Sequence, residues 1–298
     1  MGECVKNKKR KEALSGYLFI LPLFAGLGIF FFWSFFQNFW FSFTNRTTFG
    51  ETSFIGLDNY TRLFADPRLP QAVWQTLQYV FLSVPAIIIL ALVLANWLNM
   101  KIKFKGIYRT LIFLPAVTMP AAIGLIWRGL MNYQFGIINA ALGVFGIEGV
   151  PWLADPRFVI PAISIVLIWS NVGYQMILFL AGMQGIGRTY YEAAEIDGAS
   201  PTQQFFKITL PLLSPVIFFV MITTIIQVIQ VFDFIILMIR YPSAVWGASR
   251  SLVSWFFEES FRLFNHGYGA AIAMVLFVII MVFTAVQMFL QRKWVHYD

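Results

Sequence analysis

The sequence is poor in the residues that build metal sites, disulfides and nucleotide-binding loops. It contains one cysteine, Cys4, and two histidines, His266 and His296, among 298 residues. A single cysteine excludes an intrachain disulfide framework and a multi-cysteine metal site. No glycine is followed directly by lysine, so the GxxxxGK[ST] phosphate-binding loop is missing. No metal and no nucleotide cofactor is therefore predicted for this chain.

Charge is also scarce. Only 12% of the residues are charged, 59% are hydrophobic, and the mean hydropathy is +0.74, whereas a soluble domain carries about 25% charged residues. This composition predicts that lipid is the solvent. The net charge of +7 does not indicate a nucleic-acid partner, because the basic residues cluster beside apolar runs. That distribution is typical of a membrane-topology signal.

Six apolar stretches are long enough to cross a bilayer, which takes roughly 20 helical residues. They predict an all-α, polytopic membrane protein with a basic tail over 1–15 and a single transmembrane domain over 16–298. Internal prolines predict kinks, and the loops between spans are long enough to form short helices. The spans lie near 16–41, 72–98, 106–131, 158–183, 213–239 and 268–290. The prolines are Pro22, Pro85, Pro115, Pro120 and Pro161.

The positions of the lysines predict the orientation. With six spans, all nine lysines fall in segments on one side: the N-terminal tail, the loops after the second and fourth spans, and the C-terminal tail. The positive-inside rule makes that side cytoplasmic, with both termini inside. The first apolar stretch is too long for the core of a signal peptide, so we interpret it as a permanent helix.

A polar segment over 184–212 interrupts the apolar pattern and contains YYEAAEIDGASPTQQFFKITLPLLSP, residues 190–215. Its first part predicts a short helix that ends at Gly198 in left-handed geometry. Ser200 and Pro201 then predict the N-cap and first position of a second helix. An ordinary solvated connector between two spans is the alternative interpretation.

The spacing within this segment resembles the EAA signature of importer permeases of the ATP-binding cassette superfamily. Glu192-Ala193-Ala194 is followed after three residues by Gly198, and after nine more by Ile208 and Leu210-Pro211. The carbohydrate-uptake branch is also similar at FIGLDNYTRLF (54–64), LPAVTMPAAIGLIWR (114–128), FGIINAALG (135–143) and GYGAAIA (267–273). Where that branch commonly has Gly-Gly-Pro after a Phe-Asp pair, this chain has MIRYPSAVWG.

The resemblance implies a permease subunit in a prokaryotic inner membrane. Glu192, Ala193, Ala194 and Gly198 would form a coupling helix that docks on a separate ATPase. The small alanines would allow close approach, Gly198 a sharp turn, and Glu192 a charge for the partner. The implied partners are two ATPase subunits carrying ATP and magnesium, a second homologous permease, an extracytoplasmic solute-binding protein, and a sugar or oligosaccharide.

Polar residues in two spans are candidates for the substrate pathway. Gln227, Gln230 and Asp233 recur every three residues along the fifth span, and a carboxylate at the bilayer centre costs on the order of 3 kcal/mol. Capping or bridging of neighbouring helices is the alternative role. The fourth span offers aromatic and amide side chains that suit a sugar, although interfacial aromatic belts give the same pattern. These candidates are Trp169, Asn171, Tyr174 and Gln175.

Other functions stay open at this level. A glycerol-phosphate ester would require cationic groups near the pathway, and Arg128 is the nearest candidate because no span contains a lysine. An ion-coupled secondary carrier would use Asp233 as its proton or cation site. A non-transporting membrane scaffold would leave the EAA spacing unexplained.

Overall fold

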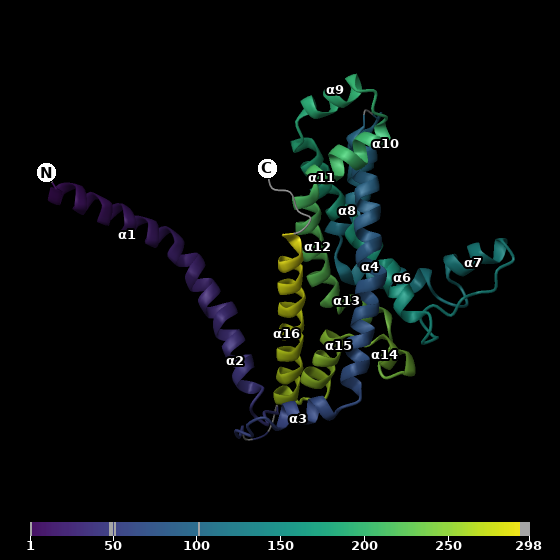
Figure 1. Cartoon of the computed structure of the whole chain (residues 1–298). Coiled ribbons are helices and arrows are strands. Elements are labelled where there is room, and N and C mark those ends of the chain that lie inside the picture. Colours follow the sequence, from purple (N-terminus) through teal and green to yellow (C-terminus); the bar gives the residue numbers. More distant parts are fainter. Residues whose placement is uncertain (1, 48–49, 51, 101, 293–298) are drawn as a thin grey trace. The chain divides into compact units, whose positions relative to one another are not determined.

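The computed structural model describes residues 2–47, 50, 52–100 and 102–292. These residues are mainly helical, and the only extended pairing among them is an isolated antiparallel bridge between Thr44 and Phe54. Five helical segments are long and apolar enough to cross a membrane, or six if the bent pair α5 and α6 is one span. The predicted all-α polytopic fold is confirmed. The chain divides into two compact units, 1–66 with 256–274 and 67–255 with 275–298 (Figure 1).

The first unit begins with a long helical segment. No residue of the most apolar 18-residue window within Leu14–Phe41 is buried. Its helices are α1 (Gly2–Leu27), the π-helical turn η1 (Gly28–Phe32), α2 (Trp33–Phe41), α3 (Asp58–Ala65), η3 (Glu258–Arg262) and the start of α16 (His266–Gln291).

Two of the family-like sequence stretches pack together in this unit. The buried amide of Asn59, in FIGLDNYTRLF, donates to the carbonyl oxygens of Ser42 and Thr44 at 2.9 and 2.8 Å. Gly267, in GYGAAIA, donates its N–H to the Arg46 carbonyl at 2.9 Å. A β-carbon at Gly267 would collide with the Thr44 carbonyl oxygen, so glycine is required by close backbone approach.

The second unit contains the remaining spans and connecting helices. In Figure 1, α9 and α10 lie at its upper end, while α14 and α15 lie at its lower end. Its elements are α4 (Arg68–Asn99), α5 (Lys105–Val117), α6 (Pro120–Leu130), α7 (Ile137–Val144), α8 (Val159–Gly185), α9 (Arg188–Ile196), α10 (Pro201–Gln204), η2 (Phe205–Thr209), α11 (Leu210–Leu212), α12 (Ser214–Ile229), α13 (Asp233–Met238), α14 (Ala244–Ser249), α15 (Leu252–Phe257) and the remainder of α16.

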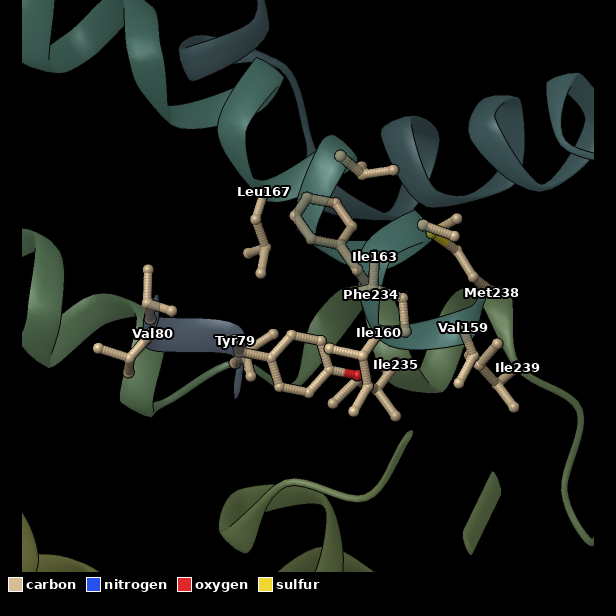
Figure 2. Packing of buried hydrophobic residues seen from close by; sticks show 14 of the residues in the cluster. Tyr79, Val80, Val159, Ile160, Ile163, Leu167, Phe234, Ile235, Met238 and Ile239 are labelled. Carbon is tan, nitrogen blue, oxygen red and sulfur yellow. The ribbon is translucent and has the colours of Figure 1, made fainter. Parts of the chain in front are cut away.

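Helix α8 is the centre of this unit and packs against α4, α5 and α12. Small residues allow the helices of this unit to approach one another most closely. A β-carbon on Gly173 would collide with the backbone of Ile112 in α5, and one on Gly124 in α6 would come within 2.9 Å of Leu237 in α13. The apolar core lies between these helices, where Figure 2 shows Phe234 of α13 beside Ile163 of α8.

The third predicted span is not one straight helix. Its residues form α5 and α6, which meet at an angle of 98°. Met119 is extended and Pro120 opens the second helix, because a proline disfavours helical geometry in the residue before it. The sequence predicted a kink here, and the structure has a full break.

The fifth predicted span is also interrupted, at residues 230–232 between α12 and α13. A break frees backbone groups that need partners inside a membrane. The Ser251 hydroxyl donates to the freed Val231 carbonyl at 2.6 Å. The segment that carries Ser251 is itself held on α4, because the Tyr79 hydroxyl donates to the Ser249 carbonyl and the Leu252 N–H donates to the Thr76 hydroxyl.

Candidate coupling segment and translocation pathway

The EAA segment forms a short helix whose C-terminus is closed by local hydrogen bonds. After α9 ends at Ile196, Gly198 adopts a φ of +76°. The Gly198 N–H donates to the Glu195 carbonyl at 3.1 Å and the Ala199 N–H to the Ala194 carbonyl at 2.9 Å. This pair of bonds is the Schellman motif, which favours glycine at the left-handed position. The predicted helix end at Gly198 is confirmed.

The second predicted helix begins as expected. Ser200 is the N-cap of α10 and Pro201 its first residue. The Ser200 hydroxyl accepts from the Gln203 N–H at 3.3 Å, while the Gln203 side chain accepts from the Ser200 N–H at 2.8 Å. This reciprocal capping box fixes the direction of α10. The turn between α9 and α10 is therefore defined at both ends by local hydrogen bonds.

Helix α9 is attached on one side and exposed on the other. The Tyr191 and Thr209 hydroxyls share a 2.9 Å hydrogen bond that links α9 to η2. Ala193 is exposed, Ala194 is half-buried, and Ile196 is 87% exposed. Since α9 is only nine residues long, its free side offers a small apolar surface at the end of the unit. The sequence placed Tyr191 and Ile196 in this helix but assigned neither of them a role.

Glu192 forms an ion pair with Arg188 one turn earlier, with Nε and Oε1 2.9 Å apart. Both side chains are largely exposed, and such a pair adds only about 0.3–0.5 kcal/mol. The i,i+4 spacing of Arg188 and Glu192 was the sequence signal that could have revealed it. The carboxylate stays accessible to a partner.

Four of the predicted pathway residues line one pocket of about 310 Å³: Asn171, Gln227, Gln230 and Asp233. The Gln227 amide donates to Asn171 Oδ1 at 2.7 Å, which joins α12 to α8. Asn171 in turn donates to the Leu167 carbonyl at 2.8 Å. Both amides are therefore held in fixed orientations.

Both helix breaks open onto this pocket. Thr118 and Pro120 come from the break between α5 and α6, and Gln230, Val231 and Phe232 from the break between α12 and α13. Asp233 is the first residue of α13, where a carboxylate complements the helix dipole. The lining contains one carboxyl group and no lysine, arginine or histidine, so its polar character comes mainly from amides and hydroxyls.

Three predicted pathway residues lie outside this pocket. Trp169 packs edge-to-face against Trp127, with ring centroids 5.6 Å apart. Tyr174 is half-exposed, and Gln175 is only 1% exposed within the helical packing. Asn171 and Gln175 are one turn apart on α8, but only Asn171 lines the pocket, whereas Gln175 is buried in the helical packing.

The fold and these elements belong to a known class of membrane protein. Residues 61–296 match the family of binding-protein-dependent transport system inner membrane components, and the chain belongs to that family. It is 34% identical to the trehalose/maltose transport system permease protein MalF of Thermococcus litoralis, over 93% of this chain and 94% of that protein. It is 30% identical to the sn-glycerol-3-phosphate transport system permease protein UgpA of Pectobacterium atrosepticum, with 93% and 94% covered.

A solved structure has the same fold. A chain of a bacterial alginate ABC transporter, in complex with an alginate pentasaccharide-bound periplasmic protein, superposes with a TM-score of 0.85 at 21% identity. The superposition covers 97% of this chain and 96% of that one. The predicted class, a membrane permease of an ATP-binding cassette importer, is confirmed.

Proposed function

We propose that this chain forms half of the translocation pathway of an importer for a sugar or oligosaccharide, driven by ATP hydrolysis on separate subunits. The observation that carries the proposal is α9: a short, locally fixed helix at one end of the second unit, with Ala193 and Ile196 exposed. Two ATPase subunits carrying ATP and magnesium, a second homologous permease and an extracytoplasmic binding protein complete the assembly.

Helix α9 is suited to transmit movement. The Schellman motif at Gly198 and the capping box at Ser200 remove local freedom from its C-terminal end, and the Tyr191–Thr209 bond links it to the start of the fifth span. A partner that pulls on α9 would therefore displace η2 and the helices that follow. Such a displacement can shift the pathway between two states if the partner contacts them differently.

The lysine distribution places α9, both termini and the loop after α4 on the cytoplasmic side. In that orientation, the pocket between the two helix breaks lies partway across the second unit, between the end that carries α9 and the opposite end. Transport would proceed toward the side of α9, as an importer requires.

The pocket suits a neutral, hydroxyl-rich cargo. Asn171, Gln227 and Gln230 can each donate and accept hydrogen bonds with hydroxyl groups, and the prolines beside them add apolar surface. A phosphate ester is the second candidate because UgpA is related. The lining disfavours it, since Asp233 would repel a phosphate and no lining residue is basic.

Reconstitution tests this function. The complete complex in liposomes should accumulate sugar only when ATP and the binding protein are supplied. The isolated chain should not transport, with or without an ion gradient. Uptake by the isolated chain driven by a proton or sodium gradient would identify a secondary carrier and contradict the proposal.

A further inference from the structure

A second pocket, of about 310 Å³, lies farther along α6 and α13 than the first. The two pockets use opposite ends of the same helices. Pro120 and Asp233, at the starts of α6 and α13, line the first pocket, while Arg128 and Met238, near their ends, line the second. Most of the lining of this second pocket lies in the segments that follow the third and fifth predicted spans, on the opposite side from the α9 segment when the spans alternate, and we name it the outer pocket.

The outer pocket carries two basic side chains. Arg128 comes from the last turn of α6, and Arg240 follows α13 by two residues. No aspartate or glutamate lines the pocket, and no hydrogen bond or ion pair from either guanidinium to another described residue is present. Sequence reasoning noted Arg128 but could not place Arg240 beside it, because 112 positions separate them.

The nearest acidic residue in the loop sequence is already paired. Ala154 lines the pocket, and the next residue, Asp155, binds Arg157 with Nη2 and Oδ2 2.7 Å apart. These hydrogen bonds lower the pKa of Asp155 below its usual value, so its carboxylate stays charged and committed to Arg157. The pair supplies no counter-charge to Arg128 or Arg240.

The walls of the outer pocket are fixed by the buried Asn139, in the stretch FGIINAALG. Its amide nitrogen donates to the carbonyls of Tyr133 and Val150, at 3.3 and 3.0 Å. Its oxygen accepts from the Trp152 indole at 2.9 Å. These bonds hold in place the two loops that carry most of the lining, and Arg128 and Arg240 lie in the same pocket as these loops.

We propose that the outer pocket receives acidic side chains of the solute-binding protein. Guanidinium groups bind carboxylates through paired hydrogen bonds, and two arginines without an internal acid leave positive charge for a partner to neutralise. The proposal rests on the proposed function, which places this end outside the cytoplasm.

The charges that line the two pockets favour a protein carboxylate over an anionic cargo as the ligand of the outer pocket. An anionic cargo held by Arg128 and Arg240 would next meet Asp233, in a pocket whose lining has no basic residue. Like charges would oppose that transfer. A carboxylate on the binding protein does not undergo this transfer into the first pocket, because the binding protein remains at the outer surface.

The test uses the complete importer in lipid nanodiscs, with its own binding protein. Arg128→Gln and Arg240→Gln should each raise the binding-protein concentration needed for half-maximal ATPase stimulation by about tenfold. The shift should shrink in high salt, where exposed charge pairs are screened. Asp155→Asn combined with Arg157→Gln, which removes this neighbouring ion pair as a unit and frees no carboxylate, is the matched control outside the lining and should leave that concentration unchanged.

A second measurement uses the unmodified protein. Phenylglyoxal modifies accessible arginines, and mass spectrometry locates the adducts. Cargo-free binding protein should protect Arg128 and Arg240 but not Arg157. Protection by free cargo alone, or no protection at all, would overturn the proposal. If wild-type importer is not stimulated by its binding protein, the proposed function fails; if all variants are stimulated equally, only this inference fails.

Discussion

The α9–α10 segment and the pocket between the helix breaks are stabilised in different ways. Local hydrogen bonds within a few residues fix the first: the Schellman motif at Gly198 and the capping box of Ser200 and Gln203. Contacts between distant segments fix the second, such as Gln227 with Asn171 and Ser251 with Val231. A surface that docks on another protein can be encoded by a short motif, whereas a pathway for a solute requires several spans.

The largest effect is expected from Gly198→Val, which should reduce uptake to less than about a tenth. A β-branched residue at positive φ costs about 1–3 kcal/mol, which would unwind the end of α9 and weaken the link to the ATPase. Uptake and co-purification with the ATPase should fall together. Gly56→Val is the control, because Gly56 has a φ of +62° and open space beside it but lies in the turn before α3. Equal losses in both variants would mean that α9 has no special role.

A smaller loss is expected from Gln227→Leu. The substitution removes the donor to Asn171, and leaving a polar group without its partner costs about 1–3 kcal/mol. The KM for uptake should rise about tenfold while the amount of assembled complex stays constant. Thr223→Val in the same helix is the control, since its hydroxyl bonds only to carbonyls of its own helix. An unchanged KM in Gln227→Leu would remove these amides from the pathway.

A still smaller effect is expected from Ser251→Ala, which leaves the Val231 carbonyl without its donor at the helix break. We expect destabilisation of about 1 kcal/mol and a two- to fivefold rise in KM, because the break carries Gln230 and Asp233 into the pocket. Ser249→Ala is the comparison, since that equally buried hydroxyl bonds to a carbonyl within its own helix. If both variants behave alike, the bond at Val231 does not position the pocket.

The smallest effect is expected from Arg188→Gln, because its ion pair with Glu192 is exposed and adds about 0.3–0.5 kcal/mol. Uptake should change less than twofold. Glu192→Gln should reduce uptake more strongly, because it also removes a charge offered to the ATPase. Equal effects of the two substitutions in the same uptake assay would show that Glu192 acts only within this pair.

The difference between local hydrogen bonds and contacts between distant segments also explains which features the sequence could predict. The ends of α9 and α10 follow from rules about glycine, serine and proline over a few residues, so Gly198, Ser200 and Pro201 were placed correctly. The six apolar spans follow from composition. Their spacing suggested that Gln227, Gln230 and Asp233 lie together, and they do share a pocket, but Gln230 lies in the helix break and Asp233 begins the next helix.

The remaining features depend on contacts between distant segments. Trp169, Tyr174 and Gln175 were chosen by residue type, but the packing of α8 determines which of its faces meets the pocket. The 98° angle between α5 and α6 exceeds what a proline alone predicts. Arg128 and Arg240 line one pocket because α6 packs against α13, which no local pattern indicates.

Cysteine crosslinking at position 193 tests most directly whether a separate ATPase drives this chain through α9. In membranes that contain the functional complex, Ala193→Cys should form an adduct with the ATPase subunit, and the yield should change when ATP binds. A cysteine in place of Ala140, exposed in α7, should give none. If the position-193 variant transports normally yet never forms an adduct with the ATPase, or is labelled only from outside the cell, the account is wrong.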